Sequence, residues 1–330
     1  MQEQFHESFR LTTADLKPLV KRASVPSLRR FAFQYSLLLC SAVLMSIDYS
    51  SLNYPLAWWI WSCSLLVFGL TVMSMFALGH ETVHRTAFES HWLNELVCWL
   101  ACLPIYYVPE IFRQFHFAHH RHTHQPGLDP EISMGGKPIP SVTSSLLLYV
   151  LWLSGLPMLF YKVAVMLGGS IGHGRLVWHY LMPYVPQRGK SRVRWESRAA
   201  LCFHLGYFYV AWHWLPGLWN LMWAQWLGHA MLAIYLTTEH NGLPHAGSAI
   251  ERTRTMLTNR LLKLLMWNMP YHAEHHAYPA VPWHALPDLH QQMQAELKHI
   301  DRSYLRFHSR ILSQVSRGHA FQDTDHRSMP

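Results

Sequence analysis

The sequence contains little charge for its length. Only 14% of its 330 residues are Asp, Glu, Lys or Arg, and 50% are hydrophobic, whereas about a quarter of an average soluble chain is charged. The charged residues are absent from whole stretches rather than being thinned evenly along the chain. This composition argues against a soluble globular protein and favours a chain that lies partly in lipid.

Paired cysteines and a signal peptide are also missing. The five cysteines form no CxxC motif, and all of them lie in apolar stretches: Cys40, Cys63, Cys98, Cys102 and Cys202. We interpret them as small core residues of a protein in a reducing compartment. The N-terminal residues are polar and lack the apolar core of a signal peptide. No haem- or flavin-binding segment, internal repeat or fused soluble domain is visible in the sequence.

The sequence contains several long runs of apolar residues. Four of them are long enough, or nearly so, to cross a bilayer core that needs about 20 residues: Phe31–Ile47, Leu56–Leu78, Ala199–Leu215 and Leu218–Thr237. Two further runs, 93–108 and 144–167, are interrupted by Pro104 and by Gly155-Leu156-Pro157. We expect these two to lie at the membrane interface or to re-enter it, packed against protein.

The basic residues flank these apolar runs. The net charge of +8 comes largely from an N-terminal cluster, an Arg-rich loop around 175–198 and the C-terminal segment. Positive charge next to membrane spans indicates the cytoplasmic side, so we expect no nucleic-acid partner. Four crossings in two hairpins keep all three basic regions and both termini cytoplasmic. The predicted fold is therefore an all-α integral membrane protein with interfacial or re-entrant helices and a cytoplasmic cap, divided into 1–30, 31–290 and 291–330.

Histidine is the residue type in excess. The chain has 25 histidines against 27 lysines and arginines, and histidine is the commonest metal-binding side chain. His80 and His84 form an HxxxH motif at the end of one apolar run, and His240 ends another. Two other segments share the spacing HxxHH, which places three rings on one helix face: His116, His119 and His120, and then His272, His275 and His276. All nine fall on the predicted cytoplasmic side.

Imidazole is a ligand that suits iron, copper, zinc and nickel. Eight or nine neutral imidazoles are enough to hold two metal ions. The first motif also reads as HExxH, the signature of zinc proteases, but a protease would need one site with a third ligand. That interpretation leaves six clustered histidines unexplained. The repeated HxxHH spacing therefore favours one dinuclear site.

The order HxxxH, HxxHH, HxxHH in a membrane chain resembles the membrane fatty acid desaturase and hydroxylase superfamily. The segment from Arg113 to His120, followed by Asp129-Pro130-Glu131, is similar to the second histidine box of that family. The segment from Asn268 to His276 is similar to the third. The resemblance covers roughly residues 30–290 and includes a bacterial branch. It implies a multi-pass protein of the bacterial inner membrane with its histidine boxes in the cytoplasm.

The resemblance also implies a di-iron centre (Fe2+/Fe3+) that uses O2 as co-substrate. Its ligands would be His80, His84, His116, His119, His120, His240, His272, His275 and His276. Four further residues are candidate acceptors for imidazole N–H groups: Asp129, Glu131, Asn268 and Glu274. Leu236 replaces an asparagine that assists one iron in animal stearoyl desaturases, and Glu239 or Asn241 can substitute for it. The extra histidines His122 and His124 are expected to support the ligands or to lie at the surface.

The expected reaction is desaturation of a fatty acyl chain, with electrons from a separate ferredoxin or cytochrome. Arg113, Arg252 and Arg254 are candidates for a basic docking face. Two alternatives remain open. The first alternative is a hydroxylase, ketolase or desaturase of a small non-acyl substrate, for example an enzyme similar to dihydrorhizobitoxine desaturase. A non-enzymatic membrane protein that handles haem or metal is the third possibility, although the histidines lie at the ends of apolar runs rather than at mid-membrane depth.

Overall fold

Helices make up most of the structure, as the sequence predicts. The computed structural model describes residues 11–49 and 51–323. Within this part of the chain the strands have two residues each and form two small pairs. These pairs are β1 (Ser133–Met134) with β2 (Lys137–Pro138), antiparallel, and β3 (Thr255–Met256) with β4 (Ile300–Asp301), parallel.

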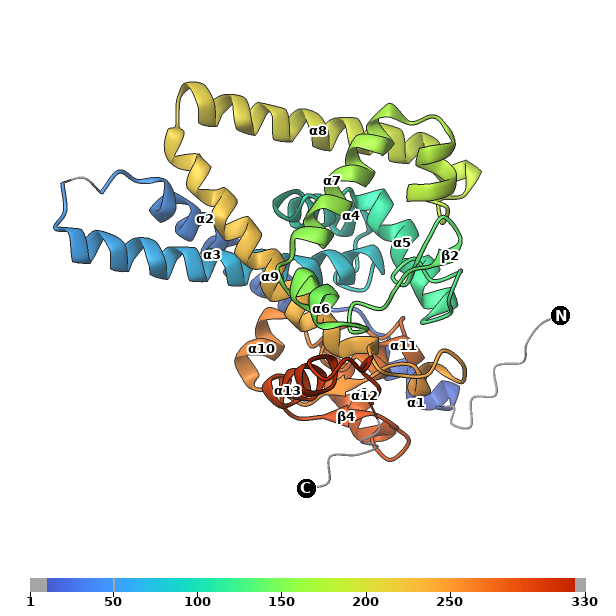
Figure 1. Cartoon of the computed structure of the whole chain (residues 1–330). Helices are drawn as coiled ribbons and strands as arrows, with labels where there is room; N and C mark the ends of the chain where they lie inside the picture. The colour runs from blue at the N-terminus through green and yellow to red at the C-terminus, as the bar shows by residue number, and fades with distance from the viewer. Residues whose placement is uncertain (1–10, 50, 324–330) are drawn as a thin grey trace.

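Four long helices form two hairpins at the places where the four apolar runs lie. They are α2 (Ser24–Ser46), α3 (Tyr54–Val83), α8 (Lys190–His213) and α9 (Leu221–His240). The second hairpin turns through the short helix η4 (Pro216–Asn220). Figure 1 shows the turns of both hairpins projecting away from the rest of the molecule. Many large apolar side chains on these helices are exposed, such as Trp59 at 72% and Trp212 at 73%, which is typical of a surface that faces lipid.

The two hairpins meet where α3 crosses α9. Gly69 on α3 lies against Leu227, and Gly228 on α9 lies against Val72. A Cβ atom on Gly228 would be 2.5 Å from Cγ1 of Val72 and 2.9 Å from the carbonyl oxygen of Gly69. The helices approach this closely because both glycines lack a side chain, a common device in membrane helix packing.

The two interrupted apolar runs fold as bent helix pairs. The axes turn by 94° between His91–Ile105, which is α4 (His91–Cys102) plus η1 (Leu103–Ile105), and α5 (Pro109–His122). They turn by 64° between α6 (Leu146–Leu153) and α7 (Leu156–Ile171). The second bend is at Gly155, whose φ of +73° suits glycine, followed by Pro157 near the start of α7. Such bends fit either a broken span or a re-entrant segment, so the interfacial or re-entrant placement stays a prediction.

The length and composition of the helices confirm only part of the expected number of membrane crossings. Among the described residues, α3 is the one helix that is long and apolar enough to cross a membrane by itself, and up to three spans result if each bent pair counts as one. The other three helices of the hairpins have 20 to 24 residues, but α8, for example, begins with a charged segment, Lys190–Arg198. Four crossings therefore remain a prediction.

A compact cap covers the inner end of the hairpins. Its helices are α1 (Thr13–Leu19), α10 (Arg260–Leu265), α11 (His272–Ala277), α12 (Leu286–Met293) and α13 (Tyr304–Val315). Leu289 and Met293 of α12 are fully buried in its core together with Leu286. The expected C-terminal tail contains β4 and α13. Helix α13 packs on α6 through Phe307 and on α9 through Tyr304. The remaining short helices are η2 (Leu176–Leu181), η3 (Gln187–Gly189) and η5 (Ala249–Glu251).

Candidate metal centre

The three histidine motifs and His240 come from four helices that end near one another. His80 lies in the last turn of α3, and His84 is the residue that caps it. The second motif occupies the last half of α5, the third forms most of α11, and His240 is the last residue of α9. The cap places α11 against these helix ends, so segments far apart in the sequence converge.

The nine predicted histidines fall into two adjacent groups, in each of which one ring nitrogen per residue lies within 4.8 Å of the others. The five-histidine group contains His80, His84, His116, His120 and His275. The four-histidine group contains His119, His240, His272 and His276. Both HxxHH motifs are divided between the groups, so each of α5 and α11 contributes to both. The rings of His120 and His276 stack across the boundary with centroids 4.2 Å apart.

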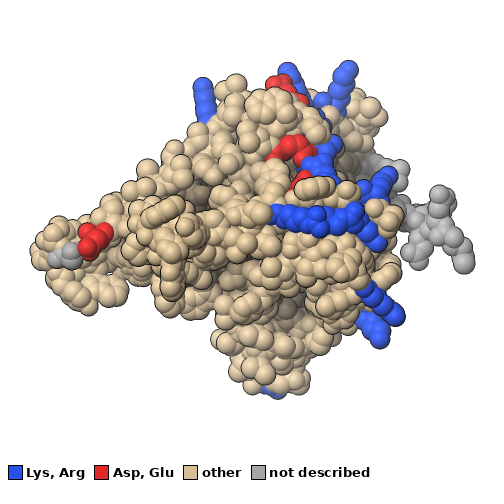
Figure 2. All heavy atoms as spheres, turned by 90° about the horizontal axis from the view of Figure 1, so that it is seen from above, with Lys and Arg blue, Asp and Glu red and all other residues tan. Residues whose placement is uncertain are grey.

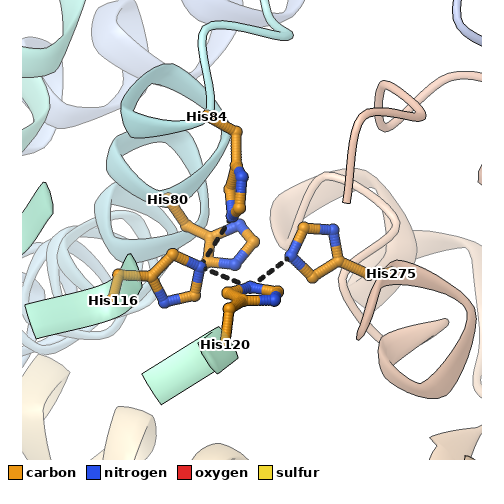
Figure 3. Close-up of side chains that lie close together, drawn as sticks. All are labelled: His80, His84, His116, His120 and His275. Carbon is orange, nitrogen blue, oxygen red and sulfur yellow. Dashed lines mark hydrogen bonds between the residues drawn. The ribbon is translucent and has the colours of Figure 1, made fainter. Parts of the chain in front are cut away.

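The rings of the five-histidine group point at one another (Figure 3). Nε2 of His116 is 2.7 Å from Nε2 of His84 and 2.9 Å from Nε2 of His120. Nε2 of His120 is in turn 3.1 Å from Nε2 of His275. Both ring nitrogens of His80 are buried without a hydrogen-bond partner in the described chain. One Nε2 carries either a hydrogen or a lone pair, so one nitrogen shared by two others is poorly satisfied by hydrogen bonds. A central cation would satisfy all five.

The four-histidine group is fully buried, and its rings are anchored from behind. Nε2 of His119 and His276 are 3.3 Å apart, and those of His272 and His240 are 3.0 Å apart. Each Nδ1 lies near an oxygen on the outside of the group. The hydroxyl of Thr123 is 3.2 Å from Nδ1 of His276, and the carbonyl oxygen of Arg252 is 2.8 Å from Nδ1 of His240.

The other two rings of this group face carboxylates. Both carboxylate oxygens of Asp129 lie 3.0 Å from Nδ1 of His119, and an oxygen of Glu131 lies 3.6 Å from the same nitrogen. An oxygen of Glu239 lies 3.5 Å from Nδ1 of His272. Asp129 and Glu131 were predicted as supporting residues. The sequence suggests Glu239 only as a substitute for a missing iron contact. Its position directly before His240 is the sequence feature that could have predicted its place beside the rings.

Burial keeps most of these imidazoles neutral, which is the form that binds a metal. Burial, and after it the neighbouring imidazoles, lowers the pKa of His272, His275 and His276 well below its usual range. His119 is the exception. Burial opposes its charge, but Asp129 and Glu131 outweigh burial and raise its pKa to about 9. Asp129 therefore interacts strongly with the proton on Nδ1 of His119, leaving Nε2 for a metal ion.

The other predicted supporting residues lie away from the nine rings. The side-chain nitrogen of Asn268 donates to the carbonyl oxygen of Trp283 at 2.9 Å. Glu274 accepts hydrogen bonds from the hydroxyl of Thr255 and from His290, and so ties α11 to β3 and α12. Its role here is to fix the position of the helix that carries the third motif.

The extra histidines of the second motif differ in burial. His124 is buried, its Nδ1 lies 3.0 Å from the carbonyl oxygen of Pro244, and its ring lies near those of His240 and His245. His122, at the end of α5, is half-buried. Only His124 is therefore placed to support the metal-facing rings.

The three arginines proposed for a docking face are buried. Arg113 is paired with Glu110 and Glu95, and Arg252 donates to the carbonyl oxygen of Thr123. Arg254, fully buried, is paired with Asp323. That part of the prediction is wrong, because these guanidinium groups hold loops together and present no charge to a partner.

A di-iron centre fits this donor set. The nine side chains are neutral or become neutral on metal binding, and their nitrogens converge in two groups. Both ring nitrogens of His80 and Nδ1 of His272 lack a hydrogen-bond partner among the described residues. Carboxylates on the far side of ligand imidazoles are typical of protein metal sites. Zinc in a protease would leave one of the two groups without a function.

The sequence of the chain matches a known protein family. The family model described as "Fatty acid desaturase" matches residues 55–308. The chain is 30% identical over 97 residues to the sn-1 oleoyl-lipid 12-desaturase of Anabaena variabilis, covering 29% of this chain and 27% of that protein. It is 26% identical over 260 residues to the sphingolipid delta(4)-desaturase of Candida albicans, covering 74% and 65%. The chain thus matches less than two thirds of the length of either relative.

Proposed function

The chain belongs to the fatty acid desaturase family, and from this we propose that it introduces a carbon–carbon double bond into a fatty acyl chain, using O2 and a di-iron centre held by the nine histidines. The observation that carries the proposal is the convergence of all nine predicted histidines in two adjacent groups of five and four. Three of the relatives are named as oleoyl-lipid desaturases, which favours an acyl substrate over the small non-acyl one.

Bound iron would supply the oxidant that removes hydrogen from an unactivated C–H bond. The residues of the chain have three tasks around it. The imidazoles hold the metal in its buried position, and the oxygens behind the four-histidine group fix the orientation of its rings. His84 and His120 are only partly buried, so the five-histidine group is the more accessible of the two.

The electron balance requires a separate donor. Removal of two hydrogens from the substrate yields two electrons, and complete reduction of O2 to water needs four, so a ferredoxin or cytochrome must supply the other two. The exposed basic residues of the Arg-rich loop, Arg175 and Arg188, offer positive charge to an acidic carrier. Figure 2 shows Lys and Arg side chains gathered on one part of the molecule, whereas the projecting end bears none on this face.

This charge distribution also supports a membrane orientation. We infer that the four long helices cross a bacterial inner membrane and that the basic surfaces, the histidine groups and both termini are cytoplasmic. The hairpin turns, with their exposed apolar side chains, would lie on the far side.

The test is a product analysis in cells that express the wild type or His275→Ala. Fatty acids are converted to methyl esters and examined by mass spectrometry, where desaturation gives a loss of two hydrogens and hydroxylation a gain of one oxygen. We expect a new unsaturated ester with the wild type and none with His275→Ala. His179→Ala, an exposed histidine outside both groups, is the matched control and should retain the product. An oxygenated product would instead assign the chain to the hydroxylases.

A further inference from the structure

Negative charge surrounds the two histidine groups unequally. The carboxylates within 4 Å of a grouped histidine, in the described part of the chain, all face the four-histidine group: Asp129, Glu131 and Glu239. The five-histidine group has no such neighbour there. The hydrogen bonds of its rings run among His84, His116, His120 and His275 only, and His80 has none.

The two carboxylates next in sequence to members of the five-histidine group are turned away from it. Glu81 follows His80, but its carboxylate accepts from the backbone N–H of Trp283. Glu274 precedes His275, but its carboxylate faces Thr255 and His290. The two groups also differ in access. All four members of the carboxylate-backed group are buried, whereas His84 and His120 in the other group are partly exposed. Charge and exposure thus distinguish the same two groups independently.

We propose that the two metal positions are inequivalent, and that Asp129 and Glu239 make the four-histidine group the site that retains its metal. This inference rests on the proposed di-iron function. A divalent ion among five neutral imidazoles keeps a net charge of +2 in a buried place, which is unfavourable. The same ion in the four-histidine group is offset by the two buried carboxylates that face His119 and His272.

The five-histidine group has one ligand more, which by itself favours metal retention there. The contacts around the four-histidine group outweigh this advantage. A fifth imidazole adds one neutral donor to the five-histidine group. In the four-histidine group three Nδ1 atoms lie within hydrogen-bonding distance of an oxygen, that of Asp129, Arg252 or Thr123. Nδ1 of His272 makes no hydrogen bond among the described residues, but an oxygen of Glu239 lies 3.5 Å from it. Such outer contacts orient the rings and make them stronger donors, and losing one costs about 10- to 100-fold in metal affinity. Asp129 and Glu239 act through His119 and His272, so they are positioning residues.

The prediction is tested by the release of iron from the purified full-length protein in detergent. Excess ferrozine, a water-soluble chelator of ferrous iron, is added to the reduced protein, and the absorbance of its iron complex is followed with time. We expect two phases of about one iron each per chain, with the five-histidine group emptying first. His84→Ala should lose the fast phase and keep the slow one, and His272→Ala should do the reverse.

Variants that replace a carboxylate with the corresponding amide test the effect of the charge with little change to the fold. Asp129→Asn and Glu239→Gln keep the size and polarity of each side chain, and each should accelerate the slow phase by about tenfold or more without changing the fast phase. Asp301→Asn is the matched control. It removes a buried carboxylate from β4 that faces Arg310 instead of a grouped ring, and it should leave both phases unchanged.

Each outcome has a distinct meaning. Release of both irons in one phase, or equal acceleration by Asp301→Asn and Asp129→Asn, would overturn the inequivalence and leave the di-iron function standing. Fewer than about two irons per chain in the wild type would overturn the proposed function itself. Should Asp129→Asn not fold, as judged by its thermal unfolding without metal, Glu239→Gln provides the same comparison on a different helix.

Discussion

At the scale of single residues, a hydroxyl supports one of the grouped rings. The oxygen of Thr123 donates to the backbone carbonyl of His119 at 3.0 Å, so it faces Nδ1 of His276 with a lone pair, at 3.2 Å. That contact fixes the tautomer of His276 and leaves Nε2 free for a metal. Thr123 follows His119 by four residues, one turn of α5, which is why one hydroxyl reaches both.

The variant Thr123→Val tests this contact, because valine has the shape of threonine without the hydroxyl. We expect the affinity for iron, measured by competition with a chelator of known affinity, to fall by about tenfold. Thr123→Ser restores the oxygen and should restore most of the affinity. If serine binds as weakly as valine, packing of the methyl group matters and the hydrogen bond to His276 does not.

The identity of the grouped histidines could be predicted from spacing, but their division could not. The motif HxxHH places His116, His119 and His120 on one face of α5, and that much follows from helix geometry. Neighbouring residues on a helix differ by about 100° in direction, so His119 and His120 point to different sides of that face. Which group each joins depends on where α9 and α11 lie, and this arises from long-range packing.

At the scale of elements, breaks in the sequence predicted the bends in the structure. Pro104 lies in η1, between the two helices of the first bent pair, because proline lacks the N–H needed to continue a helix. Gly155 has a positive φ and so ends α6 in a conformation that other residues rarely adopt. The bend angles of 94° and 64° could not be derived from these residues, since they are set by the helices packed alongside.

The close crossing of α3 and α9 gives a prediction for stability. In Gly228→Ala the new Cβ would meet Cγ1 of Val72 at 2.5 Å and the backbone oxygen of Gly69 at 2.9 Å. Because backbone cannot move cheaply, we expect the two helices to separate and the protein to lose about 1–3 kcal/mol of stability. The measurement is a thermal unfolding curve of the purified protein in detergent.

Gly206 on α8 provides the control for that experiment. A Cβ atom there meets no other atom within 4 Å, and alanine is a better helix former than glycine by about 1 kcal/mol. Gly206→Ala should therefore unfold at the same temperature or slightly higher. Equal behaviour of the two variants would mean that the crossing tolerates a side chain and that its glycines are not needed for the approach of the hairpins.

At the scale of the whole molecule, the position of the two chain ends depends on the number of membrane crossings. An even number of spans leaves both ends on one side, and an odd number separates them. Loop charge predicts four spans, whereas the length and composition of the described helices support one to three. The difference arises because α8 carries charges in its first half and because α2 and α9 hold polar residues within their length. Polar residues that face neighbouring helices are tolerated in a bundle, so we expect four.

Single cysteines near the ends distinguish these arrangements. In a protein whose exposed native cysteines Cys40, Cys63 and Cys202 are replaced by alanine, one cysteine is introduced at Lys21, at Arg317 or at Ser51, all of which are exposed. A membrane-impermeant maleimide is added to intact spheroplasts and to inside-out vesicles, and labelling is measured by a gel shift. With four spans, Lys21→Cys and Arg317→Cys react in the vesicles only, and Ser51→Cys, in the first hairpin turn, reacts in the spheroplasts. Labelling of Lys21→Cys and Arg317→Cys from opposite sides would instead require an odd number of spans, such as α3 alone or α3 together with both bent pairs.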